Sequence, residues 1–192
     1  RVKGIEIETF IHGAMCVSVS GRCFISQFLF NKSANRGECL QPCRREYLVE
    51  DAEEGHKLKI GNNYVMSPKD LCSLPFIDKL IEAGIDAFKI EGRNRSPEYV
   101  QKTTEVYRAA IDFYAKNKDK KDFRQKFESL KKQLIAELNQ VYYRGFSPGF
   151  YFGMPTSDDW TDVHGSKATT RKIYIGKIIH FYKRINVAEV KI

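Results

Sequence analysis

Four of the five cysteines in this chain lie in one short stretch, at Cys16, Cys23, Cys39 and Cys43. The gaps between them are six, fifteen and three residues. Neither the 3.6-residue period of a helix nor the two-residue period of a strand produces that spacing. The packing of a buried face therefore does not require it, whereas a group of thiolates around a metal does. We take residues 8–43, which also contain Glu8 and His12, as the feature around which the chain is organised.

The expected compartment bears on how these cysteines are interpreted. No apolar run approaches the roughly 20 residues that span a bilayer, and no signal peptide is recognisable, so we predict a cytoplasmic protein with no membrane contact. Thiols there stay reduced, and clustered cysteines more often bind metal than form disulfides. Four thiolates suit a [4Fe–4S] cluster or a Zn²⁺ ion, but the spacing matches neither a zinc ribbon nor a ferredoxin. Thiols buried in a core are the alternative, and we assign Cys72, beside Leu71 and Leu74 on a predicted helix, to the core.

The charge of the chain favours an anionic partner. The net charge is +8, and 42% hydrophobic with 12% aromatic residues is the composition of a globular protein, not of a disordered one. RNA or a small acidic substrate would suit such a surface, although a solvated lysine-rich face is the plain alternative. Four arginines lie among the cysteines: Arg22, Arg36, Arg44 and Arg45.

Two stretches alternate with the period of a strand. Residues 4–12 place isoleucines on one face, with Glu8 and His12 on the other. Residues 85–91 place Lys89 and Glu91 on one face, and a turn with Arg93 follows. Shorter strands are predicted at 44–49 and 57–60, and two alternating segments occupy 171–192.

Helix signals lie between these strands. Ser67-Pro68-Lys69-Asp70 predicts the start of a helix, with serine as the N-cap and proline at the first position, and Gly84 predicts its end. Ser96-Pro97-Glu98 repeats the start signal and opens a helix to about residue 116, and a further amphipathic helix covers 123–143. Strands alternating with helices predict an α/β protein with a parallel sheet.

These elements are too few for a complete fold of that class. Two βα units do not close a core, and two final strands do not make a domain. The sequence also lacks an initiator methionine. We therefore expect a piece of a longer protein, with one domain in residues 1–153, a linker in 154–170 and the start of a β-domain in 171–192.

The cysteine stretch resembles the signature of peptidase family U-32. The matching residues read E-x-F-x2-G-A-M-C-x4-G-x-C-x-I-S from Glu8 to Ser26. Further similarities are G-x-C-x3-C-R at 37–44, S-P-K-D-L at 67–71, K-I-E-G-R at 89–93 and the R-G-F-x2-G-F-Y-F-G loop at 144–153. Together they cover about residues 4–153.

The resemblance implies a fold. It is a modified (β/α)8 barrel of the TIM type, in which residues 4–12 would be the seventh strand and residues 85–91 the eighth, with the cysteines in a long insertion between them. Barrel enzymes carry their chemistry at the carboxyl ends of the strands. On this basis we expect Glu8, His12, Lys89, Glu91 and Arg93 to be the catalytic residues of a charged pocket. A structural ion network is the alternative, and a Glu8–Lys89 pair facing solvent would contradict the pocket.

The resemblance also implies a function. The family is labelled collagenase-like, but it includes hydroxylation factors that carry an iron–sulfur cluster on four cysteines. One branch is tied to 5-hydroxylation of the wobble uridine of tRNA and requires prephenate. We therefore expect Cys16, Cys23, Cys39 and Cys43 to bind a [4Fe–4S] cluster, with tRNA or a small prephenate-like anion as partner. Zn²⁺ bound with the help of His12 is the alternative cofactor.

Two other functions stay open at this point. A metal-dependent or cysteine peptidase would act on a peptide substrate, but the sequence contains neither G-x-S-x-G nor H-E-x-x-H. A zinc-stabilised binding module would use the cysteines for folding alone. His12 could bind metal, move a proton or bind a carboxylate, and a hydrogen-bonded histidine without chemistry fits equally well.

Overall fold

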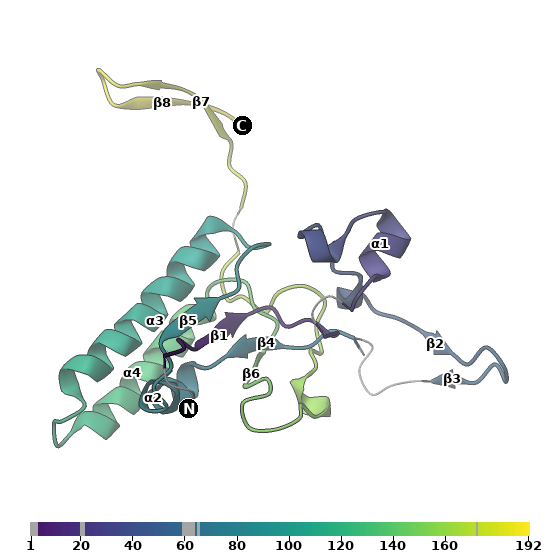
Figure 1. Cartoon of the computed structure of the whole chain (residues 1–192). Helices are drawn as coiled ribbons and strands as arrows, with labels where there is room; N and C mark the ends of the chain where they lie inside the picture. The colour runs from purple at the N-terminus through teal and green to yellow at the C-terminus, as the bar shows by residue number, and fades with distance from the viewer. Residues whose placement is uncertain (1–3, 20–21, 59–63, 65, 172) are drawn as a thin grey trace.

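The computed structural model describes residues 4–19, 22–58, 64, 66–171 and 173–192. A four-stranded sheet in the order β5-β1-β4-β6 forms its centre (Figure 1). Strands β1 (Glu8–Gly13) and β5 (Ala87–Ile90) are parallel. Strand β4 (Asp70–Cys72) runs antiparallel to β1 and parallel to β6 (Phe146–Ser147). The α/β class is therefore confirmed, but the sheet is mixed and not parallel throughout.

The pairing of β1 with β5 is the arrangement expected of neighbouring barrel strands. Glu8 lies opposite Ala87, and His12 opposite Ile90. Within the described residues the four strands form an open sheet, so a closed (β/α)8 barrel stays a prediction.

The prediction of a helix beginning at Ser67 is wrong. Residues 70–72 form β4, and a 3-10 helix (Leu74–Phe76) and α2 (Ile77–Glu82) follow it. The whole of β4 is buried between β1 and β6, and these backbone pairings outweigh the local helix signal. Cys72 consequently lies on a strand, although it belongs to the core as predicted. Gly84 follows α2 with a positive φ of 72°, as the C-terminal signal predicts.

The first strand is shorter than the alternation predicts. Regular pairing begins at Glu8, and Ile5 and Ile7 are exposed instead of packing on helices. The register of β1 against β5 shifts between Phe10 and His12. The shift breaks the two-residue period, so that Ile11 and His12 are both buried.

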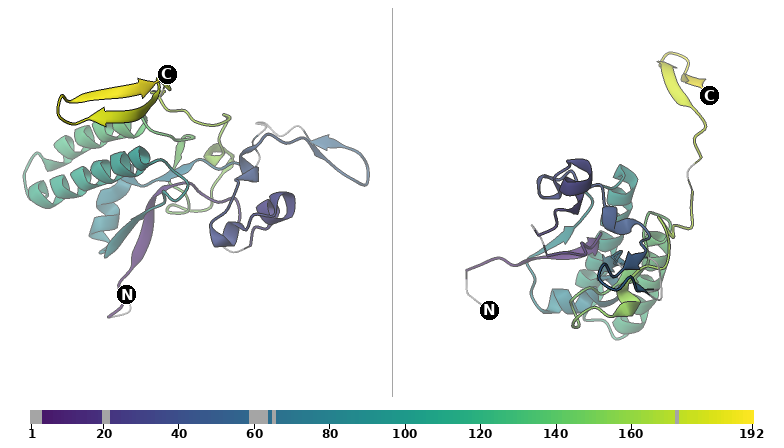
Figure 2. Two further views of the ribbon diagram at one scale, coloured as in Figure 1. Left: turned by 90° about the horizontal axis from the view of Figure 1, so that it is seen from above. Right: turned by 90° about the vertical axis from the view of Figure 1, so that its right-hand side faces the viewer.

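Two long helices cover the face of the sheet that contains Ile11. They are α3 (Pro97–Asn117) and α4 (Phe123–Leu138), which lie side by side in Figures 1 and 2. The side chain of Ser96 accepts a hydrogen bond from the backbone N–H of Tyr99, which confirms the predicted N-cap of α3. Helix α4 ends five residues before the predicted Tyr143. Tyr107 and Phe127 of these helices meet Ile11, Cys72 and Leu74 in the core.

The cysteine stretch has little regular structure. It contains α1 (Ile25–Phe30) and two 3-10 turns, Ala34–Arg36 and Pro42–Arg44. A hairpin of β2 (Val49–Glu50) and β3 (Lys57–Leu58) follows. The strand predicted at 44–49 is wrong, because Arg44 ends a 3-10 turn and pairing begins only at Val49. Residues 1–3, Gly21 of the signature, residues 59 and 60 of the next predicted strand, and residue 65 lie outside the described part.

The C-terminal strands β7 (Lys177–Tyr182) and β8 (Val187–Lys191) form the hairpin that their alternation predicts. Figures 1 and 2 show this hairpin projecting away from the sheet and helices. Its side chains are exposed on both faces. A last 3-10 turn, Ser157–Asp159, lies before it. The predicted domain boundaries at 153 and 171 stay predictions, and residue 172 is outside the described residues.

Candidate functional site

A pocket of about 650 Å³ lies where the end of β1, the cysteine stretch and the turn after β5 meet. Its volume is in the range of small-molecule sites. All four cysteines of the stretch line it. The other lining side chains that carry charge or an aromatic ring are Phe10, His12, Arg44, Glu91, Arg93 and Phe150.

The four cysteines approach this pocket from different turns of the stretch. Cys16 is exposed, Cys23 and Cys39 are half-buried, and Cys43 is buried. The Sγ atom of Cys16 accepts a hydrogen bond from the N–H of Ser18 at 3.4 Å, and that of Cys39 accepts one from Gln41 at 3.3 Å. The loops therefore present backbone donors to two of the sulfurs, as loops that hold thiolate ligands do.

Cys43 is electrostatically coupled to its neighbours. Burial raises the pKa of its thiol, and the adjacent Arg44 guanidinium lowers it. The thiols of Cys16 and Cys39 raise this pKa further. Cys16 and Cys39 therefore lie close enough to Cys43 to affect its thiol, although 27 positions separate Cys16 from Cys43.

The structure does not draw three of the described sulfurs together as a single ion would. A tetrahedral Zn²⁺ with bonds of about 2.3 Å places its sulfur ligands about 3.8 Å apart. Among the described residues, no three of the cysteine sulfurs all lie within 4.8 Å of one another. A [4Fe–4S] cluster spreads its ligands farther, because each thiolate binds a different iron.

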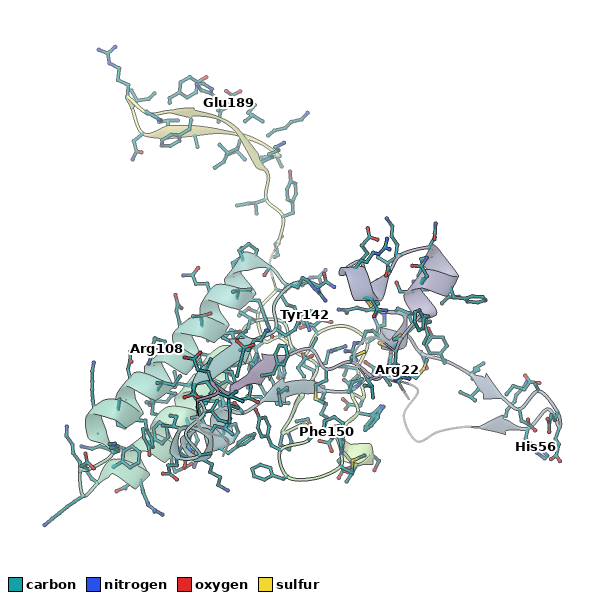
Figure 3. The ribbon with its side chains drawn as sticks, in the orientation of Figure 1. Arg22, His56, Arg108, Tyr142, Phe150 and Glu189 are labelled. Carbon is teal, nitrogen blue, oxygen red and sulfur yellow. The ribbon has the colours of Figure 1, made fainter. Side chains whose placement is uncertain are left out.

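One group of three ligand atoms in the described residues does lie within 4.8 Å: Asp51, Glu54 and His56. All three are exposed on the turn between β2 and β3, where Figure 3 labels His56. The carboxylate of Asp51 accepts hydrogen bonds from the N–H groups of Glu53 and Glu54. Turn formation accounts for this group without a metal.

His12 is buried at the carboxyl end of β1, with 1% of its surface exposed. Burial lowers its pKa to about 4; Asp70 raises it and Arg95 lowers it further, so the ring is neutral at pH 7. Its Nδ1 atom lies 3.3 Å from the Tyr107 hydroxyl, which donates to the carbonyl oxygen of Ile11 at 2.9 Å. Because that hydroxyl has one proton, we assign the N–H of His12 to Nδ1 and the lone pair to Nε2.

The five residues predicted to be catalytic fall into separate groups. Lys89 Nζ contacts Glu8 Oε1 at 2.9 Å, but both side chains are about half exposed and neither lines the pocket. Glu91 and Arg93 do line it, and Glu91 Oε1 accepts a hydrogen bond from the N–H of Arg93 at 3.1 Å. His12 joins them at the pocket.

The position of Glu91 depends on a glycine. Gly13 has a φ of 129°, and a Cβ atom there would lie 2.5 Å from the carbonyl oxygen of Glu91. The N–H of Glu91 donates to the carbonyl of His12 at 2.8 Å. Only glycine permits this approach, which holds the end of β5 against the end of β1 at the pocket.

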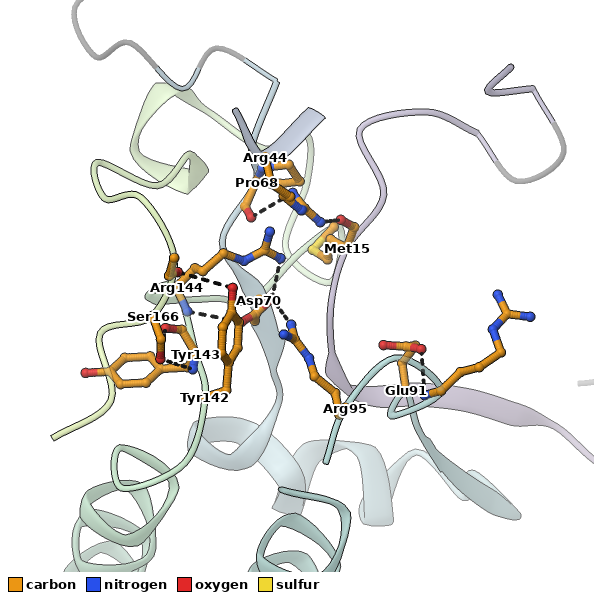
Figure 4. Close-up of polar contacts among 12 residues, drawn as sticks. Met15, Arg44, Pro68, Asp70, Glu91, Arg95, Tyr142, Tyr143, Arg144 and Ser166 are labelled. Atoms are coloured by element: carbon orange, nitrogen blue, oxygen red, sulfur yellow. Dashed lines mark hydrogen bonds and ion pairs between the residues drawn. The ribbon is translucent and has the colours of Figure 1, made fainter. Parts of the chain in front are cut away.

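Next to the pocket, and sharing Arg44 with its lining, is the buried arginine cluster, defined here as Arg44, Arg95, Arg144 and Asp70 (Figure 4). Arg144 Nη2 contacts Asp70 Oδ1 at 2.6 Å, and the N–H of Arg144 donates to Asp70 Oδ2 at 3.1 Å. Arg95 Nη2 lies 3.4 Å from Asp70 Oδ1, and its guanidinium stacks 4.0 Å from the ring centre of Tyr142. Asp70 thus holds two arginines from distant loops.

Arg44 makes a different set of contacts. It donates from Nη1 to the carbonyl of Pro68 at 3.4 Å, and from Nη2 to the carbonyl of Met15 (Figure 4). Burial and then the nearby charge of Arg144 lower its pKa to about 10, which leaves it protonated at neutral pH.

Asp70 and Arg144 were missed as site residues in the sequence. Asp70 looked like a helix first-turn residue, and Arg144 was one residue of a glycine-aromatic loop. Neither local pattern indicates burial. The signal available in the sequence was that Arg44, Asp70 and Arg144 each lie in a segment that resembles the same family.

The comparisons with known proteins agree on the family, although the relatives are named for different activities. The model of peptidase family U32 matches residues 1–161. A collagenase of Porphyromonas gingivalis is 44% identical over 98% of this chain, and an uncharacterized protease of Methanocaldococcus jannaschii is 42% identical over 98% of it. A tRNA hydroxylation protein P1 of Bacillus subtilis is 35% identical over 92% of the chain. The chain spans 44%, 45% and 41% of the lengths of these three relatives.

No solved structure matches the chain. Among the described residues, no helix is both long and apolar enough to cross a membrane. On the family model and the curated relatives, this chain belongs to peptidase family U32.

Proposed function

We propose that this chain is part of an iron–sulfur-dependent tRNA modification protein that hydroxylates the wobble uridine at C5. The observation that carries the proposal is the meeting of Cys16, Cys23, Cys39 and Cys43 at one pocket. The tRNA hydroxylation proteins among its relatives supply the substrate class.

The four cysteines would hold a [4Fe–4S] cluster. The wide sulfur spacing and the backbone N–H groups that point at Cys16 and Cys39 support a cluster over a single zinc ion. Such a cluster supplies one-electron transfer when bound. Binding of the substrate would depend on the pocket's own side chains.

Those side chains suit a nucleotide of an RNA. Arg44 and Arg93 give the pocket positive charge, and the net charge of the chain is +8. Phe10 and Phe150 are exposed at the pocket, where an unstacked base could pack on their rings; Figure 3 labels Phe150. His12 offers the lone pair of Nε2 as a neutral hydrogen-bond acceptor.

Iron, sulfide and tRNA analyses test this proposal together. We expect the intact protein, purified without oxygen, to contain one cluster per chain, and cells lacking it to lose 5-hydroxyuridine-derived nucleosides from their tRNA. Cys39→Ser should abolish both the iron and the nucleoside, as measured by metal analysis and mass spectrometry. Cys72→Ala is the control, because Cys72 belongs to the core and is not among the residues that line the pocket. Zinc without iron or sulfide would contradict the proposal and favour a zinc-stabilised binding module.

A peptidase is the second candidate, favoured by the 44% identity to a protein named collagenase. A cysteine peptidase needs a thiolate paired with a base. The Nδ1 side of His12 is engaged by Tyr107, and its lowered pKa makes it a weak base. Degradation of gelatin that Cys16→Ala abolishes, with tRNA nucleosides unchanged in cells carrying that variant, would establish the peptidase instead.

A further inference from the structure

The buried arginine cluster carries more positive than negative charge. In the part of the chain that the structure describes, Arg95 and Arg144 share one carboxylate, that of Asp70, and Arg44 forms no ion pair. Arg144 and Asp70 are almost fully buried, with 2% and 1% of their side-chain surface exposed. Charge removed from water in this way is costly unless an opposite charge lies close to it.

Several donors of this cluster also lack acceptors. Nε of Arg44, and Nε and Nη1 of Arg144, are buried without a hydrogen-bond partner among the described residues. Buried donors of a charged group rarely stay unpaired in folded proteins. An anionic group in the adjacent cysteine pocket would offset the surplus charge.

Arg44 connects the two ends of the cysteine stretch. It directly follows Cys43, and it donates a hydrogen bond to the carbonyl of Met15, which directly precedes Cys16. The other arm of its guanidinium reaches the carbonyl of Pro68, just before β4 (Figure 4). The planar fork of arginine makes two such bonds from one side chain, which a lysine does not reproduce.

We propose that Arg44 is a positioning residue for the metal cluster, which fixes Cys16 against Cys43 and offsets the negative charge of the bound thiolates. The inference rests on the proposed iron–sulfur function. Four thiolates outweigh the charge of a [4Fe–4S] core, so the bound cluster is an anion. Arg44 lines the same pocket as the four sulfurs, and Arg144, which pairs with Asp70, is a second buried cation of the arginine cluster.

The test compares four forms of the intact protein, purified without oxygen: wild type, Arg44→Gln, Arg44→Lys and Arg36→Gln. Arg36 is the control, because it is an exposed arginine of the same stretch outside the pocket lining. Iron and sulfide per chain report cluster retention. A dithionite titration followed by electron paramagnetic resonance reports the one-electron reduction potential.

Removal of the positive charge disfavours addition of an electron. We expect Arg44→Gln to lower the equilibrium constant for cluster reduction at least tenfold, a shift of about 59 mV to more negative potential. Arg44→Lys should keep the wild-type potential but lose iron faster to a chelator, because it retains the charge without the fork. Arg36→Gln should match wild type in both measurements.

The outcomes separate this inference from the function on which it rests. Wild-type protein without iron and sulfide would overturn both. A wild-type cluster together with an Arg44→Gln cluster of unchanged potential and retention would overturn the role of Arg44 alone. If Arg44→Gln does not fold, as judged by circular dichroism, Arg44→Lys decides: chelator loss no faster than in Arg36→Gln overturns the inference.

Discussion

Two ion pairs beside the same sheet join similar charged groups but differ in how deeply they are buried. Asp70 on β4 binds Arg144 at 2.6 Å, and both side chains are at most 2% exposed. Glu8 on β1 binds Lys89 on β5 at 2.9 Å, with 54% and 49% of their side chains exposed. The first pair is inside the folded chain, and the second faces solvent in the described structure.

The difference shows that burial, more than distance, sets the energetic importance of a charge pair. Two exposed partners are solvated whether or not they meet, so breaking their contact costs little. A buried partner that loses its counter-charge cannot regain water. The arginine cluster should therefore govern stability, while the Glu8–Lys89 pair should be nearly neutral in this chain.

Asp70→Asn should produce the largest effect, because it leaves Arg144 and Arg95 buried without their carboxylate. We expect a loss of about 3–5 kcal/mol in the free energy of unfolding, measured by urea denaturation. Asp112→Asn is the matched control, since Asp112 pairs with Arg108 on the exposed face of α3, and it should cost under about 0.5 kcal/mol. A loss below about 1 kcal/mol for Asp70→Asn would contradict the role assigned to burial.

The pairing of Glu8 with Lys89 was easier to predict from the sequence than that of Asp70 with Arg144, although Glu8 and Lys89 were expected to face a pocket and not solvent. Glu8 and Lys89 lie on two alternating strands, and their pairing follows from the adjacency of those strands. The burial of Asp70 depends on β6 and on Arg144, which come from a loop more than 70 positions later. A local helix signal at Ser67 could not reveal that long-range pairing, and it pointed to the wrong element.

The cysteine site likewise combines a feature that is visible in one stretch of the sequence with contacts from distant parts of the chain. Their irregular spacing predicted a common site, and the structure brings all four to one pocket. The spacing of the cysteines does not indicate which cations lie near that pocket. Arg95 and Arg144 come from other parts of the chain, and both pair with Asp70.

His12 extends the comparison to a neutral buried group. The unfolded chain binds a proton at His12 near pH 6.5, whereas the folded chain does so only near pH 4, because of burial. The unfolded state therefore binds more protons between these values, so stability is full above about pH 6.5 and falls as pH decreases toward 4. We expect this contribution to reach roughly 3 kcal/mol in metal-free preparations.

Urea denaturation between pH 4 and 8 checks the His12 contribution. His12→Gln should show a shallower fall in stability than wild type, since the carboxylates common to both proteins cancel in the difference. His164→Gln, which alters an exposed histidine, should keep the wild-type slope. Equal slopes in His12→Gln and wild type would show that His12 is not kept neutral by the fold.

The smallest effect is expected at Glu8 and Lys89, and it tests the barrel most directly. A double-mutant cycle with Glu8→Gln and Lys89→Met should give a coupling free energy of about 0–1 kcal/mol. This coupling should decrease with added salt if the pair is exposed as described.

The chain spans under half the length of the collagenase and the protease compared above, so the same cycle in the intact protein asks a second question. A coupling well above 1 kcal/mol that salt does not reduce would show that further strands cover the pair, as the interior of a closed barrel requires. A small, salt-sensitive coupling in the intact protein would instead exclude Glu8 and Lys89 from any pocket.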